Sequence, residues 1–278
     1  MRIIHFSDSH AGGPAEDWRA YLDKRWVGVF NYRFRRKFQH DQRRLAQAVD
    51  FILRHPPDLA VCTGDITSTG QPGEFAAARA ILDPLVRAAD IPFLFIPGNH
   101  DWYVHHPPCV AALRETVLHL NRGRFGLDDL PLRLTVGPVA LLVVNECRPS
   151  NLLASWGILP KEASRQVAAW CAEPRPRPRI LVGHYPLIEP HPWLRLRHRL
   201  FGERQVRALL AQGDLDLSLC GHQHRPYAWL DARGRGEVCA GSITRNACLA
   251  EIEYDPGGDI FRHRKLVFHG DGDPVPQP

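Results

Sequence analysis

The sequence predicts an α/β fold in which two packed β-sheets lie between helices. Short apolar runs rich in branched residues recur along the chain and end in Gly, Asp, Asn or His. These runs cover residues 2–10, 58–65, 92–101, 179–186 and 215–224. Runs that are apolar on both faces are typical of central strands covered by helices. Helical patterns lie between the runs, and this alternation favours a layered fold.

Helices and hairpins account for most of the remaining chain. Apolar residues three and four apart predict helices, at about 42–55, 73–89, 107–120, 161–171 and 203–212. Turn residues between apolar runs predict antiparallel strand pairs, in 132–145, 227–242 and 248–268. The chain has no internal repeat and no Gly-, Ser- or Pro-rich linker, so we expect one domain over residues 1–268. The polar segment 269–278 is expected to be a disordered tail.

Composition limits the classes of function. The chain of 278 residues has a formal net charge of +5, which suits an anionic partner. A stretch of about 18 apolar residues is absent and the N-terminus turns polar early, so we expect a cytoplasmic protein. The seven cysteines form no CxxC pair, and most lie in apolar runs. We expect them to be buried, reduced thiols.

Two basic, aromatic inserts interrupt the pattern of strands and helices, at about residues 24–40 and 186–204. In the first insert, a helix would place Trp26, Phe30, Phe34 and Phe38 on one stripe with arginines beside or opposite it. Both inserts alternate aromatic or aliphatic side chains with arginine. They form either a rim over a binding site or amphipathic helices whose apolar faces pack on the protein body.

Polar side chains gather where the five apolar runs end. The parallel strands of a layered fold bring such ends to one edge, where binding sites are commonly built. Carboxylate, amide and imidazole groups without thiolates suit two ions of the Mn, Fe or Zn type, and Asp65 is a candidate for a carboxylate shared by both. Gly64 before it would let the backbone approach closely. The strand-end residues are Asp8, His10, Asp65, Asn99, His100, Asp101, His184, His222 and His224.

Five sequence blocks, in this order, resemble those of the calcineurin-like metallophosphoesterases. They are Asp8-Ser9-His10, Gly64-Asp65, Gly98-Asn99-His100-Asp101, Gly183-His184 and Gly221-His222-Gln223-His224. The resemblance implies a four-layer αββα double β-sandwich. It also implies a hydrolase that cleaves a phosphodiester or pyrophosphate bond through attack by a metal-bridged hydroxide.

The resemblance also assigns roles to the residues of the blocks. It implies two divalent ions, for which we favour manganese, with iron or zinc as alternatives. One ion would be held by Asp8, His10, Asp65 and His224, and the other by Asp65, Asn99, His184 and His222. His100 would contact the phosphoryl oxygen and protonate the leaving alkoxide, and Asp101 would orient His100. A scaffold that binds metal without catalysis is the alternative class, although such scaffolds usually lose ligands that this chain retains.

The blocks leave the substrate open. The order of blocks resembles bacterial cyclic-nucleotide phosphodiesterases, and the basic aromatic inserts suit the UDP-2,3-diacylglucosamine pyrophosphohydrolases of lipid A synthesis, which act at the inner membrane surface. The partner would thus be a nucleotide, or a nucleotide-linked lipid at an anionic membrane; nucleic acid is disfavoured. Oligomeric state is not predicted. Candidate substrate or membrane contacts are Trp26, Phe30, Arg33, Phe34, Arg35, Arg36, Tyr185, Trp193, Arg195 and Arg197.

Overall fold

Two six-stranded sheets form the centre of the computed structural model, which describes residues 1–151, 154–174, 178–188 and 198–277. For residues 35–37 it describes the backbone. The first sheet has the order β14-β13-β12-β1-β2-β3. Its strands are β1 (Arg2–Phe6), β2 (Leu59–Cys62), β3 (Phe93–Phe95), β12 (Cys248–Asp255), β13 (Ile260–Val267) and β14 (Val275–Gln277).

The second sheet has the order β10-β11-β9-β7-β5-β4. Its strands are β4 (Leu132–Val136), β5 (Val139–Val143), β7 (Arg179–Val182), β9 (Leu217–Cys220), β10 (Tyr227–Leu230) and β11 (Gly236–Cys239). A small parallel pair, β6 (Gly157–Ile158) and β8 (Leu200–Phe201), lies outside both sheets. Within the large sheets, β1, β2 and β3 are mutually parallel, as are β5, β7 and β9. The polar residues after β1, β2, β3, β7 and β9 therefore follow carboxyl ends of parallel strands.

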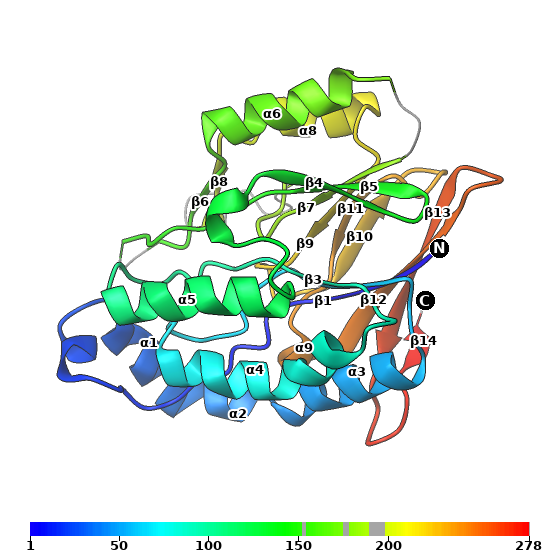
Figure 1. Ribbon diagram of the computed structural model, residues 1–278. Coiled ribbons are helices and arrows are strands. Elements are labelled where there is room, and N and C mark those ends of the chain that lie inside the picture. Colours follow the sequence, from blue (N-terminus) through cyan, green and yellow to red (C-terminus); the bar gives the residue numbers. More distant parts are fainter. Residues whose placement is uncertain (152–153, 175–177, 189–197, 278) are drawn as a thin grey trace.

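Helices cover the outer face of each sheet and give four layers (Figure 1). Helices α3 (Arg43–Arg54), α4 (Pro72–Arg87) and α5 (Pro107–Leu120) pack on the first sheet, and α6 (Lys161–Ala172) and α8 (Arg204–Gln212) pack on the second. A third apolar cluster, which includes Ile3, Val61, Leu141 and Val182, fills the space between the sheets. The αββα prediction is confirmed, and burial of apolar surface in three layers is its physical basis.

The first insert is helical, which is the conformation in which its four aromatic residues share one stripe. After the short 3₁₀ turn η1 (Trp18–Tyr21), the chain forms α1 (Arg25–Asn31), the π-helical η2 (Tyr32–Arg36) and α2 (Lys37–Gln39). Figure 1 places α1 at the end of the molecule opposite the N-terminus. The remaining short helices are η3 (Leu127–Asp129) and α9 (Ile243–Asn246).

Two predictions about the chain are settled by these elements. All seven cysteines are buried thiols outside any disulfide, as expected. The tail, by contrast, is not wholly disordered, because β14 pairs antiparallel with β13 and aligns Val275 with Val267. The backbone hydrogen bonds of β14 extend the first sheet. A short polar sequence does not reveal such pairing, because the hydrogen bonds are formed by the backbone and not by the side chains.

Candidate metal centre

Sharp turns at the strand ends aim the candidate ligands inward. Asp8, His10, Asp65, His222 and His224 all have positive φ angles, between 49° and 66°. This left-handed conformation is uncommon for residues with side chains and is often retained where function requires it. Each turn reverses the chain just beyond a parallel strand, so the side chain projects over the edge of the sheets.

Close backbone contacts fix the two central turns against each other. Gly64 has a φ of +92°, and a Cβ atom there would lie 2.2 Å from the Gly98 nitrogen. A Cβ atom on Gly98 would lie 2.2 Å from Asp65 Oδ1. Glycine is therefore required at both positions because the two turns pack backbone to backbone, rather than because of an approach to the metals.

Four of the predicted ligands form a first group. Atoms of Asp8, His10, Asp65 and His224 all lie within 4.8 Å of one another. Nε2 of His10 lies 2.8 Å from Nε2 of His224 and 3.8 Å from Asp65 Oδ2, and Nε2 of His224 lies 3.3 Å from Asp8 Oδ1. Asp8 Oδ1 is buried without a hydrogen bond. A buried carboxylate oxygen facing two imidazole nitrogens fits a cation between them.

The second group shares Asp65 with the first. Asp65, His184 and His222 offer atoms within 4.8 Å of one another, and His184 Nε2 lies 3.5 Å from Asp65 Oδ2. The amide oxygen of Asn99 joins them, 3.1 Å from His184 Nε2 and 2.8 Å from His222 Nδ1. The seven side chains are thus brought together in two groups around one common carboxylate, which is the arrangement that a two-metal centre needs.

Backbone carbonyls orient the imidazoles behind the site. Nδ1 of His10 lies 3.2 Å from the carbonyl oxygen of Thr67, and Nδ1 of His184 lies 2.7 Å from that of Thr63. Donation from Nδ1 leaves Nε2 as the lone-pair nitrogen facing the centre, as a metal ligand requires. The donor set therefore fits divalent cations of the Mn, Fe or Zn type.

Burial and neighbouring groups tune the protonation of the ligands. Burial lowers the pKa of His184 and brings that of His222 well below its usual value. Burial alone would raise the pKa of Asp8, but the neighbouring His10 and His224 imidazoles bring it well below its usual value. Neutral imidazoles beside an ionised carboxylate are the protonation states that bind metal.

His100 lies at the same edge, and the structure corrects how it is oriented. Its Nδ1 lies 2.7 Å from the carbonyl oxygen of Ser68, and its ring stacks on Tyr103 with centroids 5.1 Å apart. The Asp101 carboxylate instead accepts hydrogen bonds from the Gly98 amide and from Thr67. The prediction that Asp101 orients the His100 ring is therefore wrong, because Asp101 stabilises the turn between the two blocks.

A hollow of about 250 Å³ opens onto the two groups, and its lining adds residues that the sequence did not single out. His198, which lies outside the five sequence blocks, is here with Nδ1 3.2 Å from Nε2 of His222. Arg245 comes from α9 and Ser155 from the segment before β6, and no motif marks them. The hollow is lined by Asp65, Asn99, His100, Ser155, His198, His222, Gln223, His224 and Arg245.

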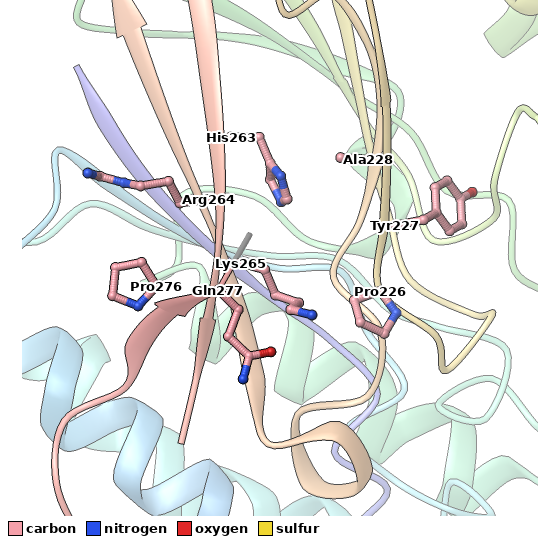
Figure 2. A pocket seen from close by; sticks show the side chains of 8 residues that line it. All are labelled: Pro226, Tyr227, Ala228, His263, Arg264, Lys265, Pro276 and Gln277. Carbon is pink, nitrogen blue, oxygen red and sulfur yellow. The ribbon is translucent and has the colours of Figure 1, made fainter. Parts of the chain in front are cut away.

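A larger hollow of about 540 Å³ lies elsewhere, between β10, β13 and β14 (Figure 2). Arg264 and Lys265 are its cationic residues, His263 lies next to them, and Tyr227 lies at its side. None of the metal ligands is among its lining residues. This hollow is larger than the one at the ligand groups, so the chemistry of the side chains, and not volume, locates the candidate centre.

Glu146, which the sequence gave no reason to choose, lies behind His184. Its Oε2 accepts hydrogen bonds from the His184 and Tyr185 amides, at 2.9 Å and 2.8 Å. Burial raises the pKa of Glu146 to about 8. Its position three residues after the end of β5, near the carboxyl end of a strand, was the signal that could have identified it.

The predicted substrate contacts fall outside the hollow or outside the described residues. Tyr185 is buried and packs on His222, with ring centroids 4.3 Å apart, so it supports the ligand. The aromatic stripe, described below, does not line the hollow. The side chains of Arg35 and Arg36, and residues Trp193, Arg195 and Arg197, lie outside the part of the chain that the structure describes.

Comparison with known proteins identifies the family. Residues 1–226 match the family described as calcineurin-like phosphoesterase. The chain belongs to this family. The predicted resemblance is thereby confirmed over most of the chain.

Relatives of known or assigned activity match shorter stretches. A glycerophosphodiester phosphodiesterase, GpdQ, from Enterobacter lignolyticus is 47% identical over 86 residues, which is 30% of this chain and 28% of the relative. A probable cyclic nucleotide phosphodiesterase from Rhodococcus erythropolis is 22% identical over 168 residues, 60% of this chain and 52% of the relative. The matches thus span about half or less of these relatives.

Solved structures share the fold. A dimetal phosphatase from Danio rerio has a TM-score of 0.61 at 14% identity, covering 99% of this chain and 98% of that one. A purple acid phosphatase from yellow lupin has a TM-score of 0.56 at 10% identity, covering 95% of this chain and 50% of that one. At these identities the similarity is one of fold.

Proposed function

We propose that the chain is a metal-dependent hydrolase of phosphodiesters. The observation that carries this is the position of Asp65, whose carboxylate is shared by two groups of imidazole and oxygen ligands at the floor of one hollow. Asp8, His10, Asp65 and His224 would hold one divalent ion. Asp65, Asn99, His184 and His222 would hold the other. We favour manganese because the donors are oxygen and nitrogen atoms.

The bound ions would activate a water molecule for attack and neutralise charge on the phosphoryl oxygens. The protein supplies the proton. Donation from His100 Nδ1 to the Ser68 carbonyl leaves Nε2 to exchange a proton in the hollow that His100 lines. We assign His100 as the general acid for the leaving oxygen, a role that typically contributes 10²–10⁴-fold to the rate.

The protein also positions the substrate. Arg245 and His198 are among the residues that line the hollow and are not predicted ligands. A guanidinium and an imidazole there would hold the non-bridging oxygens and the second ester group of a phosphodiester. Glycerophosphodiester and cyclic-nucleotide substrates are supported by the activities named for the two matched relatives.

A nucleotide-linked lipid pyrophosphate is the alternative substrate. It is supported by the exposed aromatic side chains of α1 and η2. A substrate panel tests the proposal: the manganese-loaded protein is assayed on glycerophosphocholine, cyclic AMP, UDP-2,3-diacylglucosamine and bis(p-nitrophenyl) phosphate. Turnover of a diester together with inhibition by a chelator supports the proposal. Cleavage of UDP-diacylglucosamine alone favours the alternative, and the absence of any turnover favours a non-catalytic scaffold.

A further inference from the structure

The aromatic stripe of the first insert faces solvent. Trp26, Phe30, Phe34 and Phe38 are 48%, 56%, 57% and 76% exposed. The rings of Phe30 and Phe34 contact each other, with centroids 4.5 Å apart, so these two exposed side chains form one surface. The alternative that this stripe packs on the protein body is therefore wrong.

Exposed apolar side chains are concentrated in this part of the molecule. Among the described residues, seven of the eleven large hydrophobic side chains that are exposed belong to residues 18–38. Single exposed apolar residues are ordinary, whereas a cluster of large ones marks an interaction surface. We call Trp26, Phe30, Phe34 and Phe38 the aromatic stripe.

Positive charge accompanies the stripe. Residues 24–40 contain six lysines and arginines and no acidic residue. Arg25 is the exception to the predicted flanking pattern, because it is fully buried between Asp17 and Asp23, with which it forms ion pairs of 2.8 Å. Arg33 is exposed, and its guanidinium lies 5.9 Å from the Phe34 ring centroid.

A hollow beside the stripe combines apolar walls with the guanidinium group of Arg33. It has a volume of about 310 Å³, and Tyr21, Val29, Tyr32 and Arg33 line it together with residues 13–15. An apolar recess with an arginine at its wall has the chemistry to hold an anionic head group above its first methylene groups.

We propose that the aromatic stripe docks this protein onto an anionic phospholipid surface. Aromatic side chains enter the boundary between head groups and acyl chains, and arginine and lysine beside them attract the anionic leaflet. A second copy of this chain fits less well, because a symmetric interface would bring the cations of one insert against those of the other. Docking does not require catalysis, so an experiment on membrane binding can support or refute it whether or not the proposed activity is correct.

The first insert is joined to the metal centre through its first residue, Lys24. Nζ of Lys24 donates a hydrogen bond to Ser150 Oγ at 2.8 Å and lies 4.5 Å from the Tyr103 ring centroid. Tyr103 in turn stacks on His100. These contacts connect the first insert to His100, which lines the hollow at the metal centre.

Vesicle flotation tests the docking. The wild-type chain is mixed with vesicles of phosphatidylcholine and phosphatidylglycerol at 70:30, or of phosphatidylcholine alone. We expect flotation with the anionic vesicles and at least ~10-fold weaker binding to the neutral ones. Binding to the anionic vesicles should weaken as the salt concentration is raised from 50 to 500 mM. Arg33→Gln should lower the partition coefficient about five-fold.

Two matched triple variants distinguish membrane binding through the aromatic stripe from binding through exposed apolar side chains in general. Trp26→Ser, Phe30→Ser and Phe34→Ser together should lower partitioning by at least ~100-fold. Leu118→Ser, Trp229→Ser and Val275→Ser, which alter side chains exposed elsewhere, should leave it unchanged. Melting curves of both triples verify folding. Absence of wild-type flotation, equal binding to neutral vesicles, or equal loss in both triples overturns the proposal, as does a wild-type dimer that the stripe variant converts to a monomer.

Discussion

Nδ1 of His100 lies 2.7 Å from the carbonyl oxygen of Ser68, and this contact fixes which nitrogen of His100 faces the candidate metal centre. The backbone amide of His100 also donates to Asp65 Oδ1 at 2.6 Å, so the ring and the shared carboxylate are placed by one turn. The residue proposed as the proton donor is thereby held beside the two groups of ligands without being a member of either.

This arrangement predicts that His100→Ala retains metal and loses turnover. Without the general acid, kcat on a diester with a poor leaving group should fall by 10²–10⁴-fold. Elemental analysis should still find the metal content of the wild type. Loss of metal in proportion to activity would instead make His100 a ligand.

Tyr103 should act on catalysis through the His100 ring. The two rings stack at an interplanar angle of 15°, so Tyr103→Ala removes the surface against which His100 rests. We expect kcat to fall about 10-fold, with a smaller change in KM. Tyr103→Phe retains the ring and should restore kcat; equal losses in both variants would contradict a stacking role.

Gly98→Ala should displace the shared carboxylate. The added Cβ would lie 2.2 Å from Asp65 Oδ1, and the backbone around it cannot yield cheaply. Bound metal should fall from two ions per chain to fewer than one, as measured by elemental analysis. Gly13→Ala is the control, because a Cβ there meets nothing within 4 Å. Wild-type metal content in Gly98→Ala would refute this placement of Asp65.

Glu74 should make stability depend on pH. Burial raises its pKa to about 7 from 4.5, although Thr69 and Ser68 donate hydrogen bonds to it. A raised carboxyl pKa contributes stability that is fully present below pH 4.5 and is lost as the pH rises through about 7. Relative to Glu74→Gln, the wild type should lose about 3 kcal/mol of unfolding free energy between pH 4.5 and 8.

Urea unfolding across this pH range measures the difference. Glu115→Gln serves as the control, because Glu115 is exposed and pairs with Arg79 on the surface. It should leave the pH dependence of the wild type unchanged between pH 5.5 and 8. A Glu74→Gln variant with the same pH dependence as the wild type would show that Glu74 is already ionised in the folded protein.

The sequence predicted that the ligand residues would gather at one edge because they follow parallel strands, whereas their division into two groups was implied by the family resemblance. The carboxyl ends of parallel strands lie at one edge. Residues that follow such strands, for example Asp8 and His184, can therefore be predicted to lie close together before any distance is known. The four layers followed for a similar reason, since strands that are apolar on both faces require a covering on each side.

The features that the sequence missed depend on contacts between distant segments. His198 contacts a residue 24 positions further along the chain, His222, and Asp101 could be assigned to Gly98 and Thr67 only once the turns were packed together. The local sequence likewise did not show that Asp17 and Asp23 neutralise Arg25 in a buried position. Aromatic spacing showed which residues of the first insert would share one face of a helix, but it does not say whether that face is covered.

Metal stoichiometry combined with diesterase activity tests the central claim most directly. The purified chain is stripped with a chelator, reloaded with Mn²⁺, dialysed, and assayed for metal content and for hydrolysis of bis(p-nitrophenyl) phosphate, alongside Asp65→Ala. The shared-carboxylate centre predicts two ions per wild-type chain, activity that disappears with the chelator and returns with metal, and loss of both ions and activity in Asp65→Ala. Full metal loading or undiminished hydrolysis in Asp65→Ala would contradict it.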